Sequence, residues 1–253
     1  MGPEHIIARL KALRDPRMRV LTLIEALQEG DPASWVHVMA TILTRAHLQD
    51  DPDAAVALEA LAQAAGDPAL SYATRQSLYE AATEHRLGAI ARLFLVASPT
   101  TIGARQLAKS LAPERPLLPT GRPLTLGERK WLARTHDRQQ LLLLLRDPHP
   151  AVVAILLDNP HVTESDVVRV ASARPAVPAA LTAIAAHPRW SVRHPVKRAL
   201  VLNPSTPLAD AIRIATTLRQ QELRELAADP SLREPLRVHA DEVYAAALRR
   251  PRA

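Results

Sequence analysis

The segment 187–198 concentrates side chains that could bind an anionic group. It has no acidic residue, and its candidate ligands are Arg189, Trp190, Arg193, His194, Lys197 and Arg198. Ser191 is placed to cap a helix that begins at 192, and the free amides of that first turn would add positive potential. Guanidinium and ammonium groups in such a place can hold phosphates. The segment therefore predicts a site for nucleic acid or another anionic partner. The alternative is a solvated basic face with Trp190 packed between helices.

Two further basic clusters lie elsewhere in the C-terminal half. One surrounds Trp131 and consists of Arg129, Lys130, Arg134 and Arg138. The other is the tail, with Arg249, Arg250 and Arg252, for which a frayed chain end is the ordinary explanation. If the clusters around Trp131 and Trp190 share one face, they would form a nucleic-acid-binding groove. The sequence leaves open whether they do.

The basic character belongs to the C-terminal half of the chain. The 253 residues carry a net charge of +6. Residues 1–112 hold 11 Lys and Arg against 12 Asp and Glu, and residues 113–253 hold 21 against 14. A basic half attracts nucleic acid, anionic lipid or an acidic protein. Because all but four of the cations are Arg and Ala is abundant, a GC-rich genome is an alternative explanation of the excess.

Catalytic and metal chemistry find little support in the sequence. The chain has no cysteine, which excludes disulfides, thiolate metal sites, Fe–S clusters and a Cys nucleophile. Histidines near predicted turns lack the spacing of a metal site on a helix pair: His149, His161, His187 and His194. His136 and Asp137 could form an oriented general base, but no nucleophile accompanies them, and Asp137 is well placed to cap a helix. We therefore predict no metal, no cofactor and no enzymatic activity.

A recurring dipeptide marks the elements that must position these residues. Asp-Pro occurs at 15–16, 31–32, 51–52, 67–68, 147–148 and 229–230, and His187-Pro188 occupies a comparable place. Asp accepts hydrogen bonds from the free amides of a first helical turn, and Pro fits the first helical position. Each pair therefore predicts the start of a helix.

The composition favours an all-α protein. Gly is scarce at 7, aromatic residues are 3%, and Ala and Leu dominate the 47% of apolar residues. We expect N-terminal helices near 4–14, 17–29, 33–48, 53–65, 69–84, 87–97 and 103–111. Four prolines and a glycine make 112–125 irregular. The predicted organisation is an N-terminal helical array at 1–112, a Pro-rich linker at 113–125 and helical repeats at 126–253. Without a signal-peptide pattern or a long apolar run, we expect a cytoplasmic protein.

The C-terminal half contains an internal repeat. Residues 151–172 align with 195–216 at an offset of 44, and seven of the 22 positions are identical, among them Asn159/Asn203 and Pro160/Pro204. Asn tolerates the conformations that end a helix, and Pro prevents the helix from continuing. The unit is predicted as a helix, an Asn-Pro turn and a second helix, with both Asn side chains bonded to nearby backbone. A period of about 44 is in the range of two-helix solenoid repeats.

The segments 145–152 and 156–168 resemble bacterial HEAT-like helical repeats, in particular the leucine-rich repeat variant type. The likeness rests on an Asp-Pro helix start, a Leu-x-Asn-Pro turn and a Thr-Pro or Thr-Glu start of the next helix, and 200–207 matches the last two. It covers about 145–240 well and the N-terminal half poorly. The resemblance implies a right-handed α-solenoid and an interaction surface, and it implies no activity.

These observations predict a non-catalytic scaffold that binds a macromolecular partner, preferably a protein, on its solenoid surface. Nucleic-acid binding by the basic C-terminal half is the alternative. A remote alternative is a HEAT-like DNA glycosylase acting on alkylated purines. The chain has few aromatic residues, and no aromatic–Asp pattern in it matches that family's site.

Overall fold

The computed structural model describes residues 2–48, 51–95, 123–147 and 149–248, and within these ranges the protein is helical with no strand. The chain divides into two compact units, which are described separately here. Unit 1 combines Met1–Val96 with Leu208–Ala253, and unit 2 is Ala97–Pro207. The predicted helix at 103–111, most of the predicted linker at 113–125 and the tail arginines lie outside the described residues. No helix of the described chain is both long and apolar enough to cross a bilayer.

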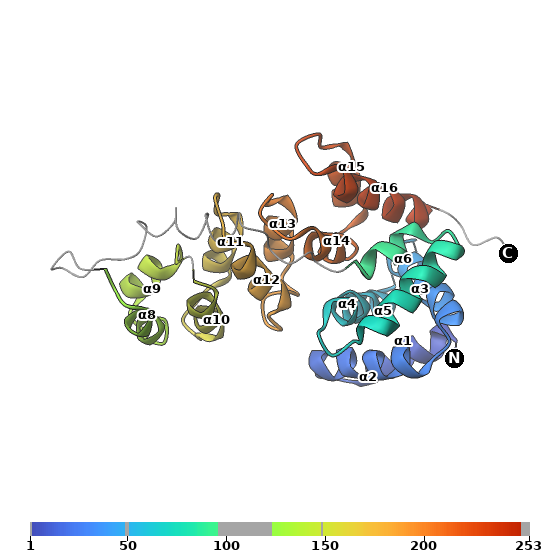
Figure 1. Ribbon diagram of the computed structural model, residues 1–253, viewed down its shortest axis with the longest axis horizontal. Helices are drawn as coiled ribbons and strands as arrows, with labels where there is room; N and C mark the ends of the chain where they lie inside the picture. Colours follow the sequence, from blue (N-terminus) through green and yellow to red (C-terminus); the bar gives the residue numbers. More distant parts are fainter. Residues whose placement is uncertain (1, 49–50, 96–122, 148, 249–253) are drawn as a thin grey trace. The chain divides into compact units, whose positions relative to one another are not determined.

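Unit 1 packs nine described helices around an aliphatic core (Figure 1). They are α1 (Pro3–Ala12), α2 (Pro16–Glu29), α3 (Pro32–Leu48), α4 (Pro52–Gly66), α5 (Tyr72–Glu84), α6 (Gly88–Leu93), α14 (Leu208–Ala215), α15 (Gln220–Ala228) and α16 (Glu234–Leu248). The helix α4 contacts α1, α2, α3, α6 and α14. Its buried side chains are mostly alanines, which let these neighbours approach closely.

Unit 2 contains six short described helices in which each contacts neighbours one or two positions along the chain (Figure 1). They are α8 (Leu126–Leu132), α9 (Arg138–Leu144), α10 (Pro150–Asp158), α11 (Glu164–Ser172), α12 (Pro178–Ala186) and α13 (His194–Leu202). Two of these helices begin with a capping box, a motif that the spacing of Thr and an acidic residue three positions later predicts. Thr125 and Glu128 open α8, and Thr163 and Asp166 open α11.

The predicted domain 126–253 does not correspond to one compact unit, because its last part packs with the N-terminal helices. His47 Nε2 lies 2.9 Å from the Thr216 carbonyl oxygen, and Arg92 forms an ion pair with Glu242. The helix α16 contacts α3 and α6. These bonds join residues separated by about 150 positions or more, and so no local pattern in the sequence indicates them.

The Asp-Pro prediction is correct for the three N-terminal pairs that open α2, α3 and α4. The carboxylate of Asp15 accepts the Arg17 amide at 2.8 Å. The carboxylate of Asp51 accepts the amides of Asp53 and Ala54. In each helix the proline is the first residue, where a missing N–H costs nothing.

The prediction is wrong for Asp67, His187 and Asp229, which end helices. Each is the C-cap of its helix, and each side chain accepts the amide two residues further on, at 2.9 to 3.2 Å. The proline therefore sits in a tight turn before the next helix. Asp147 also belongs to a turn, since the next helix begins at Pro150 with His149 as its N-cap. A side chain that accepts a hydrogen bond from the amide two residues ahead is found both at a helix start and in this turn. The dipeptide alone therefore does not distinguish a helix start from a turn that follows a helix.

Asn159 ends α10 and Asn203 ends α13, each in a turn of the same kind, as predicted. Their side chains also form hydrogen bonds with the backbone of earlier helices. The Asn159 amide Nδ2 donates to the carbonyls of Ala133 and Thr135 at 2.9 and 2.8 Å. Asn203 Nδ2 donates to those of Ala171 and Ala173 at 2.7 and 2.9 Å. Both side chains are buried. Each asparagine thus satisfies carbonyls at the end of a helix some 24 to 32 residues earlier.

We expect Asn159→Leu to lower the free energy of unfolding by about 2–4 kcal/mol, because it leaves two buried carbonyls and the His161 amide without partners. Urea titration followed by circular dichroism measures the loss. Asn159→Asp separates the two roles of the side chain. Asp67 and Asp229 occupy the same kind of turn, so Asp can accept the turn amide, but it cannot donate to the carbonyls of Ala133 and Thr135. If Asn159→Asp is as stable as the parent protein, the turn matters and the backward bonds do not.

Candidate macromolecule-binding surface

The structure divides the predicted basic segment 187–198 between a turn and the start of α13. The helix begins at His194 rather than at 192, and Arg193 is its N-cap without a side-chain cap bond. Ser191 is buried in the preceding turn instead of capping the helix. His194 and Arg198 are four positions apart in the sequence, so they lie on the same side of α13. Arg198 is exposed.

Trp190 belongs to the core and is not available to a ligand. Its side chain is 2% exposed, and its indole Nε1 donates to the Leu157 carbonyl at 2.8 Å. The exposed Arg189 lies over the ring, with the guanidinium carbon 4.2 Å from the ring centroid. Trp190 therefore packs inside the protein, and of this pair only Arg189 faces solvent.

Lys197 is also buried, with 7% of its surface exposed. It lies among Val196, Leu200 and Val201 on the inward face of α13, where the aliphatic stem of a lysine packs like an apolar side chain. Arg193 remains exposed, and its Nε lies 3.9 Å from a carboxylate oxygen of Glu164 on α11. The first cluster therefore presents Arg189, Arg193 and Arg198 to solvent, with His194 partly covered.

The second basic cluster, around Trp131, also contains both buried and exposed side chains. Arg129 is buried and paired with buried Asp147, with Nη1 2.6 Å from Oδ2. Lys130 is partly exposed, and Arg134 is exposed while its Nη1 donates to the Lys130 carbonyl at 2.9 Å. Trp131 is 65% exposed. Arg129 is therefore a structural residue, whereas Lys130, Trp131 and Arg134 form part of the surface of α8.

Arg138 links α9 to α11 through Asp166. Its Nη2 lies 2.7 Å from Asp166 Oδ1, and the same carboxylate accepts the amide and hydroxyl of Thr163. The bond from Arg138, together with those from Thr163, lowers the pKa of Asp166 to about 2 in spite of its burial. The acid is thus charged at neutral pH and joins two helices.

In the described part of unit 2, four of the six acidic side chains serve the structure, and eight arginines are exposed. Residues 123–207 hold eleven Lys and Arg against six Asp and Glu, a net charge of +5. Asp147 and Asp166 are buried in ion pairs, and Glu128 and Asp137 bond to helix N-termini. The exposed arginines are Arg134, Arg138, Arg146, Arg169, Arg174, Arg189, Arg193 and Arg198. Arg146, Arg169 and Arg174 are not among the candidates named from the sequence, because none of them has a neighbouring Lys or Arg.

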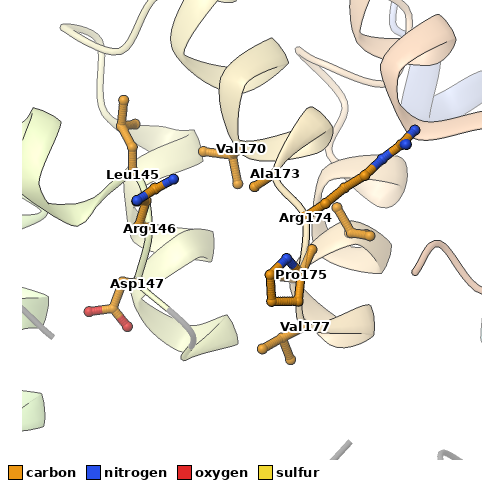
Figure 2. A pocket seen from close by; sticks show the side chains of 11 residues that line it. Leu145, Arg146, Asp147, Val170, Ala173, Arg174, Pro175 and Val177 are labelled. Carbon is orange, nitrogen blue, oxygen red and sulfur yellow. The ribbon is translucent and has the colours of Figure 1, made fainter. Parts of the chain in front are cut away.

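A small crevice separates the loop that follows α9 from the loop that precedes α12. Arg146 and Arg174 line it from opposite sides, together with Pro175 and Val177 (Figure 2). The Arg174 side chain extends away from Arg146, and its Nη2 donates to the Leu202 carbonyl at 2.7 Å. The crevice holds about 50 Å³, far below the several hundred Å³ of pockets for drug-sized ligands. It is a joint between helices with arginines at its edges.

The described residues define an all-helical protein with a basic, arginine-covered unit. They contain no group of three or more His, Asp or Glu side chains arranged to hold a metal ion. Comparison with known proteins finds no family model, no curated protein and no solved structure that matches the chain.

Proposed function

We propose that the protein is a non-catalytic helical-repeat scaffold and that unit 2 binds an acidic surface of a protein partner. The observation that carries the proposal is the segregation of charge in unit 2, where four of the six carboxylates are used in ion pairs and caps and eight arginines are exposed. Arginine is enriched at protein interfaces, and a field of one sign selects and steers a complementary partner.

We propose further that 126–207 forms part of an α-solenoid. Two features support this: helices contact their close neighbours along the chain, and Asn159 and Asn203 repeat the same backward bonds. One 44-residue period contains three helices, α10 to α12, followed by α13 to α15. Three helices per period is the number found in armadillo-type rather than HEAT-type repeats.

The exposed apolar side chains favour a protein partner over nucleic acid. Trp131 on α8 and Leu143 on α9 are 65% and 59% exposed, and α8 contacts α9. Protein interfaces combine such apolar anchors with arginine. Trp190, the aromatic residue that could have stacked on a base within the first cluster, is buried.

The proposal predicts that Arg193→Ala/Arg198→Ala weakens the complex about tenfold at low salt. The partner is first isolated from the native host and then purified, so that the Kd is measured by titration with the two pure proteins. Two rim charges worth about 0.7 kcal/mol each give a factor of this size, and added salt reduces it. The matched control, Arg14→Ala/Arg224→Ala, removes two exposed arginines of unit 1 and should change the Kd less than twofold.

Nucleic-acid binding is the second candidate, supported by the same net charge of +5 in residues 123–207. Gel retardation with random duplex and single-stranded DNA at two salt concentrations separates the candidates. Binding that falls steeply with salt and is lost in Arg193→Ala/Arg198→Ala would support nucleic acid and count against the protein proposal. The absence of retardation at low salt would remove this candidate.

A further inference from the structure

The internal repeat pairs α11 of unit 2 with α14 of unit 1. At the offset of 44 residues the two helices align along their whole length, and Arg169 of α11 is identical to Arg213 of α14. Within unit 1, α14 contacts α4 and α6, and Arg213 lies at this contact. The surface of α14 therefore shows what the equivalent surface of α11 is built to bind.

Arg213 binds the C-terminal ends of two helices. Its Nη1 donates to the carbonyl of Leu95, just beyond α6, at 3.1 Å. Its Nε lies beside the last residue of α4, where a Cβ atom at Gly66 would be only 2.7 Å away. Asp210, one turn earlier in α14, accepts from Nη2 at 2.7 Å and holds the guanidinium in place. The last carbonyls of a helix lack partners within it and carry partial negative charge, so an arginine stabilises them.

The side of α14 that carries Arg213 is buried, whereas the equivalent side of α11 is open. The four positions have the i, i+3, i+4, i+7 spacing of one helix face. In unit 1, Ala209, Ile212 and Thr216 are buried and the Arg213 side chain is 13% exposed. The equivalent residues of unit 2 are Ser165, Val168, Arg169 and Ser172. Val168 is half-buried, and the other three are exposed.

Arg169 has its hydrogen-bond donors available. Asp166 is the counterpart of Asp210, but its carboxylate is bound by Arg138 instead of by the arginine of its own helix. Among the described residues Arg169 forms no hydrogen bond or ion pair. The face of α11 thus has the same arginine and the same small neighbours as α14, without the helix ends that α14 binds.

We propose that this face of α11, made of Ser165, Val168, Arg169 and Ser172, binds the C-terminal end of a helix of the protein partner. Arg169 donates to the last carbonyls of that helix, as Arg213 does within unit 1. The inference rests on the proposed function and specifies how the partner is held. A helix C-terminus carries partial negative charge, which suits the basic unit 2. Arg193 lies 3.9 Å from Glu164 at the start of α11, so the exposed arginines and this face can contact one partner.

The test uses the full chain and a fluorescently labelled peptide with the sequence 51–67, stapled because a short isolated helix is unstable in water. This peptide is α4 with one flanking residue at each end, and it has four carboxylates and no cation. We expect anisotropy at physiological salt to detect binding. Arg169→Lys should raise the Kd about fivefold, because one ammonium group does not replace the forked donors of a guanidinium. Arg146→Lys, at an exposed arginine of the same unit, is the matched control and should change the Kd less than twofold. Neither substitution changes the net charge.

Four results would overturn the inference. The peptide does not bind, or Arg169→Lys and Arg146→Lys weaken it equally. The third is that Arg193→Ala/Arg198→Ala abolishes peptide binding while Arg169→Lys leaves it unchanged, which supports the proposed function and removes only the helix-end site. The fourth is a dimer of this chain that Arg169→Lys dissociates, since the occupant would then be a second copy. The opposite failure is also distinguishable: a native partner that ignores Arg193→Ala/Arg198→Ala contradicts the proposed function, even if the peptide responds to Arg169→Lys.

Discussion

Asp147→Ala is expected to lower the free energy of unfolding by about 3–5 kcal/mol, because it leaves the charge of Arg129 buried without a counterion. The side chains of Arg129 and Asp147 are 4% and 0% exposed, so water cannot replace the lost carboxylate. The substitution also removes the acceptor of the His149 amide in the turn before α10. Urea titration of the parent protein and the variant, followed by circular dichroism, measures the difference.

A double substitution separates the cost of an unpaired charge from the value of the pair. Asp147→Asn/Arg129→Met keeps an acceptor for His149 and fills the site with uncharged side chains. We expect it to be only about 1–2 kcal/mol less stable than the parent protein, since apolar replacement of a buried ion pair is often close to neutral. Arg129 Nε has no partner in the described structure, so the pair is not fully satisfied even in the parent protein.

Asp158→Ala is the matched control for this site. Asp158 belongs to the same unit, its side chain is 80% exposed, and it lies 3.1 Å from His187 Nε2. A pair whose carboxylate is so exposed contributes less than about 1 kcal/mol. If Asp147→Ala costs no more than Asp158→Ala, the burial of the Arg129–Asp147 pair has no energetic consequence and the argument above is wrong.

The sequence predicts local features of the fold well. The capping boxes at 125–128 and 163–166 and the Asn-Pro turns at 159 and 203 are present, because each needs only side chains within three residues of the amides that they bond. Helix content follows from composition in the same way. The position of Leu208–Ala253 in unit 1 depends on contacts with residues far along the chain, such as that of Thr216 with His47, and has no local signature.

The exposure of the candidate site residues is harder to predict, because residue type alone does not determine it, and Arg129, Trp190 and Lys197 are buried. A helix that began at 192 would place Val192 on one face with Val196 and Leu200. The observed inward face is Val196, Lys197, Leu200 and Val201, and Val192 is 42% exposed. A shift of the inward face by one residue, about 100° around the helix, therefore moves Lys197 from the surface into the core. Arg129 and Trp190 are buried for a related reason, since each finds a specific partner that is distant in the sequence: Asp147 and the Leu157 carbonyl.

His239 is predicted to make unit 1 unstable in mild acid. Its side chain is fully buried in α16, and its Nε2 lies 2.8 Å from the Thr216 hydroxyl, which donates to the Ile212 carbonyl. Thr216 therefore accepts from Nε2–H, and Nδ1 is left without a partner in the described structure. Burial, with a smaller effect of the nearby charge of Arg92, lowers the pKa of His239 to about 3.

Because folding lowers the pKa of His239, acid destabilises the folded protein. The unfolded chain binds a proton at His239 near pH 6.5, whereas the folded chain does so only near 3. Between these values the unfolded state holds more protons, so stability is complete above pH 6.5 and falls by about 1.4 kcal/mol for each pH unit below it. From pH 7 to 4.5 the loss is about 2.5 kcal/mol. Burial also lowers the pKa of His47 in the same unit, so His47 adds to the loss of stability in acid.

His239→Gln tests this assignment, because glutamine can donate to Thr216 and does not titrate. We expect the stability of the variant to fall by about 2.5 kcal/mol less than that of the parent protein between pH 7 and 4.5, measured by urea titration at each pH. Asp166 does not contribute in this window, since its carboxylate is lost only as the pH falls from about 3.8 towards 2. The control His5→Gln replaces an exposed histidine of the same unit and should keep the parent slope. Equal slopes for His239→Gln and the parent protein would place the acid sensitivity elsewhere.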